Sequence, residues 1–418
     1  MKFAHLSDIH LGFQKHEHLQ KIEQQVFENA MDKCIELGVD FILIPGDMFH
    51  VNIPEMRVQK YAFAKFRQVH DAGIPVYVVY GSHDFSPVSN SVIDLLVETG
   101  YIIKVTRATS NEDGTISLEF LVDPKTGAKI TGLSGLKVGK DVEWYEKLER
   151  SSLEAESGFK IFLFHGGIAD MKKDSAIEGD QMPLSLLPKG FDYYAGGHMH
   201  KWNHQNFDGY DNVVYPGTPF AGYHADLEEN AGGFKRGFAL VDFDDKVNSV
   251  EFVELPNTQY EIIEVNADNR KSESVNQELI EKCSSIAPEE KIVIIKVAGE
   301  LTSGKTADVD VASLREGLRE RGALVVNISK NKLTSKEYTI SEAKGSDKDE
   351  IETNVFAENI GQLRFENQDL LGEKGISLAK KLLREMGQPQ LANEKKNEYI
   401  PRVRDNALKI LGVEDDDS

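Results

Sequence analysis

Five short motifs rich in aspartate and histidine recur along the first half of the chain, and side chains of these two types bind metal ions. The motifs are Asp8-Ile9-His10, Gly46-Asp47-Met48-Phe49-His50, Gly81-Ser82-His83-Asp84, Phe164-His165-Gly166-Gly167 and Gly197-His198-Met199-His200. In Asp-x-His and His-x-His, residues i and i+2 of an extended segment lie on one face, so both side chains can reach the same ion. The neighbouring glycines allow sharp turns and close approach of the backbone. Carboxylates and imidazoles are typical ligands of manganese, iron or zinc.

The number of candidate ligands predicts two metal ions rather than one. The oxygen and nitrogen donors of the motifs, which include two carboxylates, are too many for a single ion and suit two ions about 3.5–4 Å apart, bridged by a carboxylate and a hydroxide. The candidate donors are Asp8, His10, Asp47, Ser82, His165, His198 and His200. A single Asp-x-His or His-x-His is commonly a surface or core feature. Five motifs in order, each after a predicted strand, favour a metal centre instead.

The remaining histidines lack such a context, and we interpret them as structural or solvated. For three of them, His16, His18 and His204, the sequence also leaves open a position along a groove. The others are His5, His70 and His224.

Strands and helices must position the motifs, and residues 1–255 alternate short apolar runs with helical patterns. Each motif follows a predicted strand, at 2–6, 40–45, 74–80, 159–164 and 191–195. Apolar residues at helical spacing predict helices over 18–37 and 55–70, and turn signals predict β-hairpins over 100–135. This alternation predicts layered α/β packing, in which sites form at the ends of strands.

The rest of the chain predicts a small α/β domain and a helical end. Strand patterns at 260–265, 292–297 and 323–328 alternate with helical patterns at 272–283 and 311–321. Residues 331–352 are polar and charged and indicate a flexible linker. Helical patterns follow at about 354–386 and 396–411, and the chain ends in an acidic tail. The predicted divisions are 1–255, 256–330, 331–352 and 353–418.

One motif in the small domain points to a different chemistry. Gly299-Glu300-Leu301-Thr302-Ser303-Gly304-Lys305-Thr306 fits the pattern GxxxxGK[ST] of a phosphate-binding loop. Such a loop starts its helix at the lysine, whereas residues 307–310 delay the helix here, with Asp308 or Asp310 as its N-cap. The domain is also too short for a nucleotide-binding fold of that class. We therefore interpret Lys305 as a surface lysine.

Composition and charge narrow the class of protein. The chain has 418 residues, a formal net charge of −21 and only two cysteines, Cys34 and Cys283, which excludes a disulfide scaffold and a thiolate zinc site. No apolar run is long enough to span a membrane, and the N-terminus does not resemble a signal peptide, so we expect an intracellular protein. An acidic chain that binds nucleic acid needs a local basic patch, a metal or a partner that provides positive charge.

The ordered motifs resemble those of the calcineurin-like metallophosphoesterases. More closely, they are similar to the SbcD/Mre-eleven family of double-strand-break repair nucleases in its archaeal form. The resemblance covers residues 1–220, including Tyr215-Pro216-Gly217-Thr218-Pro219, and the domain plan that follows. Phosphoprotein phosphatases of the superfamily have Arg-Gly after the Gly-Asp motif, whereas His50 is typical of the nuclease branch. The implied fold is α/β: a four-layer β-sandwich flanked by helices, with a small α/β capping domain and a C-terminal helical segment.

The resemblance also implies a role for each motif residue. Asp8, His10 and His200 would hold the first ion, His165 and His198 the second, and Asp47 would bridge both. The family has asparagine where this chain has Ser82, whose hydroxyl is a weaker and shorter ligand that a water or a slight shift could replace. His83 would stabilise the transition state and protonate the leaving 3′ oxygen, with Asp84 able to orient it. His50 resembles a second phosphate-contacting histidine.

The resemblance implies a DNA nuclease with two manganese ions per chain. Its implied activities are 3′→5′ exonuclease on double strands and endonuclease on single strands, in the processing of DNA ends. The implied partners are DNA, an SbcC/Rad-fifty-type ABC ATPase that binds the C-terminal helices, and a second copy of the chain, which would pair through the helices near 55–70 and 87–100. The implied location is the cytoplasm, in association with the nucleoid. Two alternatives stay open: another phosphoesterase of the superfamily (a phosphatase or cyclic phosphodiesterase), and a weakly active metal-binding scaffold.

Overall fold

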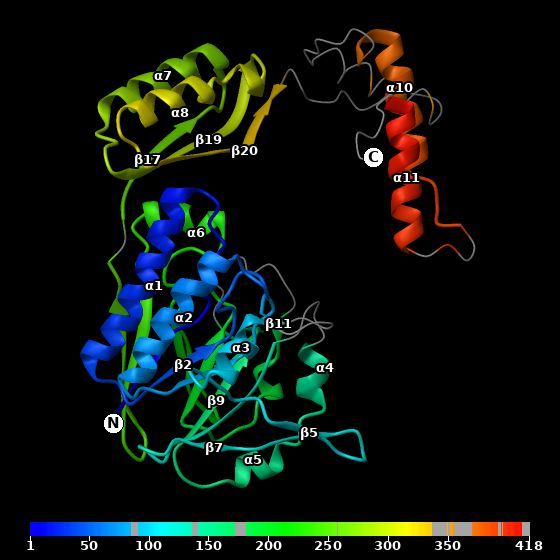
Figure 1. Ribbon diagram of the computed structural model, residues 1–418. Helices are drawn as coiled ribbons and strands as arrows, with labels where there is room; N and C mark the ends of the chain where they lie inside the picture. Colours follow the sequence, from blue (N-terminus) through cyan, green and yellow to red (C-terminus); the bar gives the residue numbers. More distant parts are fainter. Residues whose placement is uncertain are drawn as a thin grey trace. The chain divides into compact units, whose positions relative to one another are not determined.

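The structure is a computed structural model, and it describes most of the chain (Figure 1). The described residues are 1–84, 91–135, 141–171, 181–256, 258–336, 349, 352–353, 356, 370–391, 394 and 396–411. They form two compact units. The first contains Met1–Ala267, Glu273–Ala298 and Val309–Lys332, and the second contains Asp268–Ser272, Gly299–Asp308 and Leu333–Ser418.

The first sheet of the larger unit has six strands in the order β16-β15-β1-β2-β3-β4. Strands β1 to β4 run parallel, β15 pairs antiparallel with β1, and β16 pairs antiparallel with β15. The strands are β1 (Lys2–His5), β2 (Phe41–Pro45), β3 (Val76–Val79), β4 (Ile103–Lys104), β15 (Gly237–Phe243) and β16 (Val247–Glu254). Three helices connect the parallel strands: α1 (Glu17–Leu37), α2 (Met56–Asp71) and α3 (Val92–Glu98).

The second sheet also has six strands, in the order β13-β14-β12-β9-β8-β7. They are β7 (Leu121–Val122), β8 (Lys129–Leu133), β9 (Lys160–His165), β12 (Tyr193–Gly197), β13 (Asn203–Phe207) and β14 (Tyr210–Tyr215). The larger unit also contains the short elements β5 (Ala108–Ser110), β6 (Ile116–Leu118), α4 (Asp141–Glu146), α5 (Ser151–Ala155), β10 (Gly167–Ile168), β11 (Gln181–Met182) and η1 (Leu184–Leu186). Helix α6 (His224–Ala231) contributes Leu227 to the hydrophobic cluster of the first sheet and its helices.

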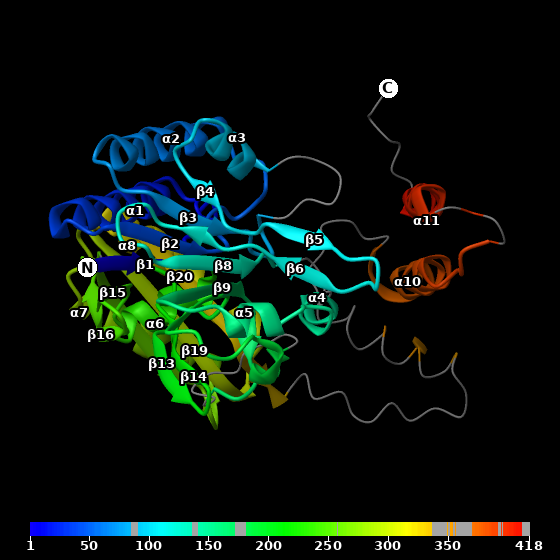
Figure 2. The same ribbon diagram turned by 90° about the horizontal axis from the view of Figure 1, so that it is seen from below.

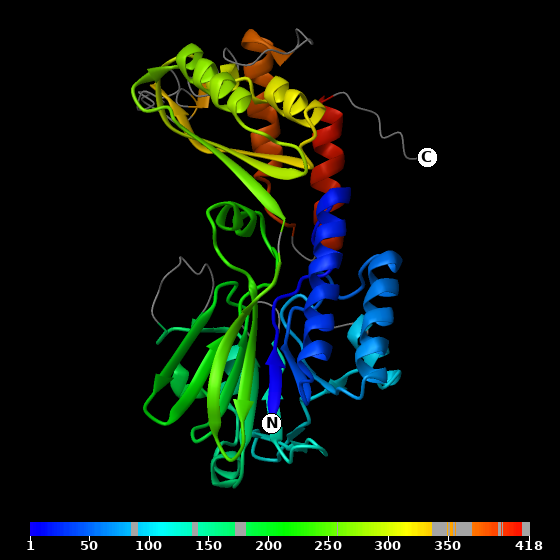
Figure 3. The same cartoon turned by 90° about the vertical axis from the view of Figure 1, so that its left-hand side faces the viewer.

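Three hydrophobic clusters hold these layers together. Phe3, Phe41, Ile161 and Tyr193 belong to the cluster between the two sheets, and all four are buried. A second cluster packs the apolar faces of α1, α2 and α3 against the outer face of the first sheet, and a third covers the outer face of the second sheet. Figures 2 and 3 show α1 and α2 side by side over the first sheet, which contains β1. The predicted α/β fold class, with two sheets between layers of helices, is confirmed.

The topology places the five motifs at one edge of the sandwich. Strands β1, β2 and β3 are parallel to one another, and so are β9 and β12 in the other sheet. Asp8, Asp47 and Ser82 follow the first three strands, His165 ends β9, and His198 follows β12. The carboxyl ends of these neighbouring strands therefore deliver the candidate ligands.

Residues 259–335 contain the strands and helices predicted for the small domain. Figure 1 shows α7 and α8 lying over its sheet, in which β19 pairs with β17, β18 and β20. The elements are β17 (Gln259–Asn266), β18 (Arg270–Lys271), α7 (Ser272–Ser285), β19 (Lys291–Ser303), η2 (Thr306–Asp308), α8 (Val311–Glu320) and β20 (Val325–Ser335). Strand β20 continues five residues into the range predicted as linker, and 337–348 lie outside the described residues.

The motif that fits a phosphate-binding loop has a different structure. Its first five residues, 299–303, are the end of strand β19 and do not form a loop. The following helix α8 starts only at Val311, where the Asp310 carboxylate accepts hydrogen bonds from the N–H groups of Ala312 and Ser313. Asp310 is therefore the N-cap, one of the two positions that the sequence allowed.

Two C-terminal helices lie in the smaller unit. Helix α10 (Gly372–Met386) occupies the end of the predicted 354–386 pattern, and α11 (Lys396–Leu411) coincides with the predicted 396–411 helix. The two helices pack on each other, with a hydrogen bond of 2.7 Å from Asn406 to Glu385. None of the described helices is both long and apolar enough to cross a lipid bilayer.

Candidate metal centre

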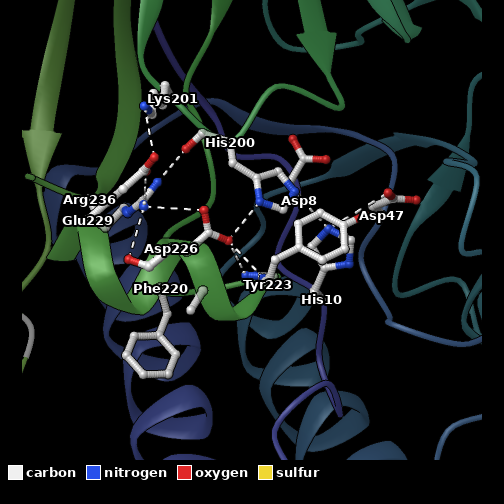
Figure 4. Close-up of polar contacts among 12 residues, drawn as sticks. Asp8, His10, Asp47, His200, Lys201, Phe220, Tyr223, Asp226, Glu229 and Arg236 are labelled. Carbon is white, nitrogen blue, oxygen red and sulfur yellow. Dashed lines mark hydrogen bonds and ion pairs between the residues drawn. The ribbon is translucent and has the colours of Figure 1, made fainter. Parts of the chain in front are cut away.

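Asp8, His10 and His200 converge on one point at the edge of the sandwich (Figure 4). Their ligand atoms all lie within 4.8 Å of one another, and the Nε2 atoms of His10 and His200 are 3.1 Å apart. Asp8 and His10 are fully buried. These three residues are the set that the family resemblance assigns to the first ion.

Asp47 lies between this group and a second one. Its Oδ2 atom is 3.8 Å from His10 Nε2 and 3.3 Å from His165 Nε2. Asp8, Asp47 and His165 form a second cluster whose ligand atoms lie within 4.8 Å of one another. The Asp47 carboxylate thus faces the donors of both groups, and its role as a bridge between two ions stays a prediction.

His198 and Ser82 lie beside the second group. The His198 ring centroid is 5.4 Å from that of His165, and the His198 N–H donates to both oxygens of Asp8 at 2.9 and 3.0 Å. The Ser82 hydroxyl is 3.5 Å from Asp47 Oδ2. Both residues are therefore close to the centre, and the assignment of either as a metal ligand remains a prediction.

His83 and His50, both half-buried, form one wall of the site. Their rings stack at 4.8 Å, and the His83 ring is 4.9 Å from the His10 ring. The His83 Nδ1 atom is 2.8 Å from the His50 carbonyl oxygen, so Nδ1 is a donor and Nε2 faces away from this contact. His10, His50 and His83 make a third cluster of ligand atoms within 4.8 Å.

Asp84 has a different position from the one expected. Its buried carboxylate accepts hydrogen bonds from the backbone N–H groups of Met48, Phe49 and Gly81, at 2.9 to 3.3 Å. The contact that fixes the His83 ring is the His50 carbonyl instead. The prediction that Asp84 orients His83 is therefore corrected. The Asp84 carboxylate points toward backbone N–H groups, and it thereby connects the loop that carries Asp47 to the loop that carries Ser82.

Glycines next to the ligands make this close approach possible. A Cβ atom on Gly81 would lie 2.1 Å from Asp47 Oδ1, and one on Gly197 would lie 2.0 Å from the Pro45 carbonyl oxygen. On Gly222, which lies outside the five motifs, a Cβ atom would meet the rings of both His10 and His200, at 2.3 and 2.5 Å. Side chains at these positions would push the ligands apart.

The buried charges at the centre interact strongly. Burial disfavours the ionised forms of Asp47 and His165, but at 3.3 Å their mutual attraction outweighs it. His165 and His10 hold the pKa of the Asp47 carboxyl well below its usual range, and Asp47 raises the pKa of His165 to about 10. The carboxylates of Asp8 and Asp47 thus attract positive charge at a buried site. A divalent cation would supply such charge.

Other imidazoles are held neutral. Burial, followed by the charge of His165, lowers the pKa of His198 to about 4. Burial and then His83 lower the pKa of His50 to about 4, and burial holds the pKa of His10 well below its usual range. A neutral imidazole has a free lone pair, which is the state that binds a metal.

A carboxylate that the sequence analysis missed orients His200. Asp226 of helix α6 lies 2.8 Å from His200 Nδ1, so that Nε2 of His200 points to His10. The buried guanidinium of Arg236 binds Asp226 and Glu229, as Figure 4 shows. Tyr223 stacks on the His200 ring at 4.8 Å. These residues belong to none of the five motifs, and only the fold brings them to His200.

The donor set fits a pair of divalent cations. The Nε2 atoms of His10 and His200 face each other at 3.1 Å, so only one of them can carry a proton. The Nδ1 atom of His200 is hydrogen-bonded to Asp226. Two buried carboxylates supply the negative charge. Nitrogen and carboxylate donors with an outer carboxylate behind a histidine form a typical site for manganese, iron or zinc.

The fold and this site define a class of protein. Residues 1–202 match the family of calcineurin-like phosphoesterases, and this part of the chain is a calcineurin-like metallophosphoesterase domain. For residues 1–202, the calcineurin-like metallophosphoesterase family expected from the motifs is confirmed.

Known proteins resemble the chain beyond this domain. It is 26% identical to the DNA double-strand break repair protein Mre11 of Archaeoglobus fulgidus, over 77% of this chain and 72% of that protein. The Mre11 proteins of Sulfolobus acidocaldarius (26% identical, 75% and 79% covered) and Saccharolobus solfataricus (25% identical, 84% and 89% covered) are also similar. Among solved structures, a dimetal phosphatase from Danio rerio matches with a TM-score of 0.36 and 10% identity, over 61% of this chain and 98% of that chain.

Proposed function

We propose that this chain is the nuclease subunit of a DNA end-processing complex, with manganese-dependent 3′→5′ exonuclease activity on double strands and endonuclease activity on single strands. The observation that carries the proposal is the convergence of Asp8, His10, Asp47, His165 and His200 into two adjoining clusters of ligand atoms. The similarity to Mre11 proteins of three archaea over most of the chain supports DNA as the substrate.

The chain's own residues would hold two ions and receive a phosphodiester. Asp8, His10 and His200 would hold one ion, His165 and His198 would hold the other, and Asp47 would be shared by both. Ser82 would complete the second site directly or through water. Bound cations would neutralise the phosphate and acidify a water for attack. The rigid strand ends fix these donors, and a fixed geometry removes part of the entropic cost of aligning the reactants.

His83 is placed to provide the proton for the leaving oxygen. Its Nδ1 is occupied by the His50 carbonyl at 2.8 Å, which fixes the ring, and its Nε2 lies 3.4 Å from the Tyr223 hydroxyl, a long contact that a substrate oxygen would replace. A protonated Nε2–H can donate to a departing 3′ oxygen, and general acid catalysis of this kind contributes about 10²–10⁴-fold. His50, stacked against His83, would contact the phosphate from the same side.

DNA binding by an acidic chain calls for additional positive charge. The formal net charge is −21, so the chain's overall field repels a polyanion. We propose that the metal ions and an SbcC/Rad-fifty-type ABC ATPase offset this repulsion, and that the chain acts as a homodimer. The C-terminal helices α10 and α11 would bind the ATPase, in the cytoplasm and at the nucleoid.

Incubation of the purified chain with Mn²⁺ and labelled single- and double-stranded DNA tests the proposal. We expect cleavage that requires Mn²⁺ and is lost in His83→Asn, while that variant still binds metal. Asp47→Ala should lose both ions, because its carboxylate faces both groups. Two bound metals without cleavage of any DNA, combined with hydrolysis of p-nitrophenyl phosphate, would favour a phosphatase instead.

A further inference from the structure

A cavity of about 390 Å³ adjoins the metal centre on the side of His50. It lies within the larger unit, between the loop that follows the first motif, the start of helix α6 and strand β20. Its volume is in the range of small-molecule sites. The nuclease mechanism proposed above uses only one of its lining residues, His50.

Flat rings form one wall of this cavity. Phe13 is half-buried, and its ring centroid lies 4.8 Å from that of His50 and 5.6 Å from that of His224. The buried side chains of Leu19 and Leu227 also line the cavity. An apolar cavity bordered by aromatic and imidazole rings favours a flat, polarisable ligand that can stack.

Polar atoms in the same lining lack partners. The Nδ1 atoms of His16 and His50 are buried and have no hydrogen bond within the described part of the chain. The Lys15 side chain, which is exposed, adds a positive charge at the cavity. Since these nitrogens are covered by the protein, the stacking wall and the charge of Lys15 carry the argument: together they favour an aromatic heterocycle with a phosphate next to it, which a nucleotide base provides.

His50 connects the cavity to the reaction site. Its ring is 5.7 Å from His10 and 4.8 Å from His83, and the same ring borders the cavity through Phe13. A phosphate held beside His83 and His50 therefore has a neighbouring base within reach of the Phe13 wall.

We propose that this cavity binds one unstacked nucleobase, that of a nucleotide next to the scissile phosphate; the inference rests on the proposed nuclease function. Stacking on an aromatic side chain accepts every base, so the cavity recognises an unpaired nucleotide rather than a sequence. A base that is still paired in a duplex must leave its stack before it can enter.

The test compares substrates that carry or lack the base. The protein with Mn²⁺ cleaves an intact short single-stranded DNA and, in parallel, a series of the same DNA. Each member of the series carries one abasic residue, at successive positions around the scissile bond. We expect kcat/KM of the wild type to fall about 5- to 150-fold when the abasic residue takes the position of the bound base, the range that one base–aromatic stack supplies. Phe13→Leu should slow the intact substrate and remove most of this penalty, because the ring is then missing from the protein.

A binding measurement separates this effect from catalysis. In the His83→Asn background, fluorescence anisotropy with Mn²⁺ should show the same dependence of DNA affinity on the base and on Phe13. Phe13→Tyr should restore the penalty, and His224→Ala, an exposed position, should reduce it without a risk to folding. Trp144→Leu removes an exposed aromatic ring of helix α4 and should leave the penalty unchanged.

The outcomes distinguish the inference from the function on which it rests. Equal cleavage of intact and abasic DNA, or an abasic penalty of the same size in the wild type and Phe13→Leu, overturns the base-binding cavity and leaves the nuclease intact. A wild type that neither binds nor cleaves DNA overturns the proposed function and the inference together.

Discussion

Several candidate ligands have a backbone conformation that their residue types rarely adopt. The φ angles of Asp8, His10, Asp47 and His198 are +51°, +49°, +47° and +95°. Residues other than glycine in this region cost of order 1–3 kcal/mol each, and they persist where the surrounding structure over-determines them. Here hydrogen bonds do so: the Asp8 carboxylate accepts the N–H of His198, and the Asp47 carboxylate accepts the N–H of His83. The strain is a property of this site that composition and spacing do not reveal.

Asp226 provides the clearest prediction for a single side chain. Its Oδ2 atom accepts from His200 Nδ1 and from the N–H groups of Gly222 and Tyr223, while Oδ1 faces Arg236. An asparagine in its place must turn its amide nitrogen toward one of these donors in either orientation. We expect Asp226→Asn to weaken Mn²⁺ binding about 10- to 100-fold, as loss of an outer carboxylate behind a metal-binding histidine does.

Calorimetric titration of the metal-free protein with Mn²⁺ measures this effect without any substrate. Glu229→Gln is the matched control, because Glu229 binds the same arginine but does not contact His200. Unchanged affinity in Asp226→Asn, or an equal loss in the control, would contradict the positioning role.

At the scale of elements, helix α1 anchors the loop that carries His10 and Phe13. The buried Glu23 carboxylate of α1 accepts hydrogen bonds from the N–H groups of Gly12 and Gln14. Burial opposes these bonds and raises the pKa of Glu23 from 4.5 to about 7. The loop next to the metal centre is therefore attached to the helix through a carboxyl group that titrates near neutral pH.

This attachment predicts a pH dependence of stability. The pKa of Glu23 is higher in the folded state than in the unfolded state, so the folded protein binds the proton more tightly, and the free energy of unfolding decreases as pH rises from about 4.5 to 7. The contribution is about 3 kcal/mol at most. Denaturant unfolding of the wild type and Glu23→Gln across pH 4.5–8 measures it: the free energy of unfolding of the wild type minus that of the variant should fall by this amount as the pH rises. Parallel pH profiles would refute the assignment.

The start of helix α6 must pass close to two ligands, which makes Gly222 sensitive to any side chain. A Cβ atom there would lie 2.3 Å from the His10 ring and 2.5 Å from the His200 ring. We expect Gly222→Ala to fold but to lose most of its affinity for the first ion, measured by the same titration. Gly317→Ala in helix α8 has nothing within 4 Å of the added Cβ and should bind metal normally. Full metal binding by Gly222→Ala would show that the two rings can separate without cost.

For the whole molecule, the arrangement of units predicts that catalysis and assembly are separable. Every candidate metal ligand lies in the larger unit, whereas α10 and α11 lie in the smaller one. Deletion of residues 351–418 should therefore leave Mn²⁺-dependent cleavage of short DNA unchanged and abolish the complex with the ABC ATPase, measured by size-exclusion chromatography of the mixed proteins. A complex that persists after the deletion would place the ATPase contact elsewhere.

The sequence by itself determined the strands, the main helices and the identity of the residues at the centre. Apolar periodicity located β1, β2, β3, β9, β12, α1 and α2, because each of these buries an apolar face. The order of the motifs after these strands indicated the family. The same local signals did not resolve strands β13 and β16, whose mostly half-buried residues have a weaker pattern.

Only the tertiary structure decided how the ligands meet. His10 and His200 are 190 residues apart, and their 3.1 Å contact exists because two sheets pack with their strand ends at one edge. The contact of Asp226 with His200, the loop-binding position of Asp84 and the cavity beside Phe13 have no local sequence signal. Each depends on segments distant in the chain that approach one another only after the core has formed, and spacing along a sequence does not encode such distances.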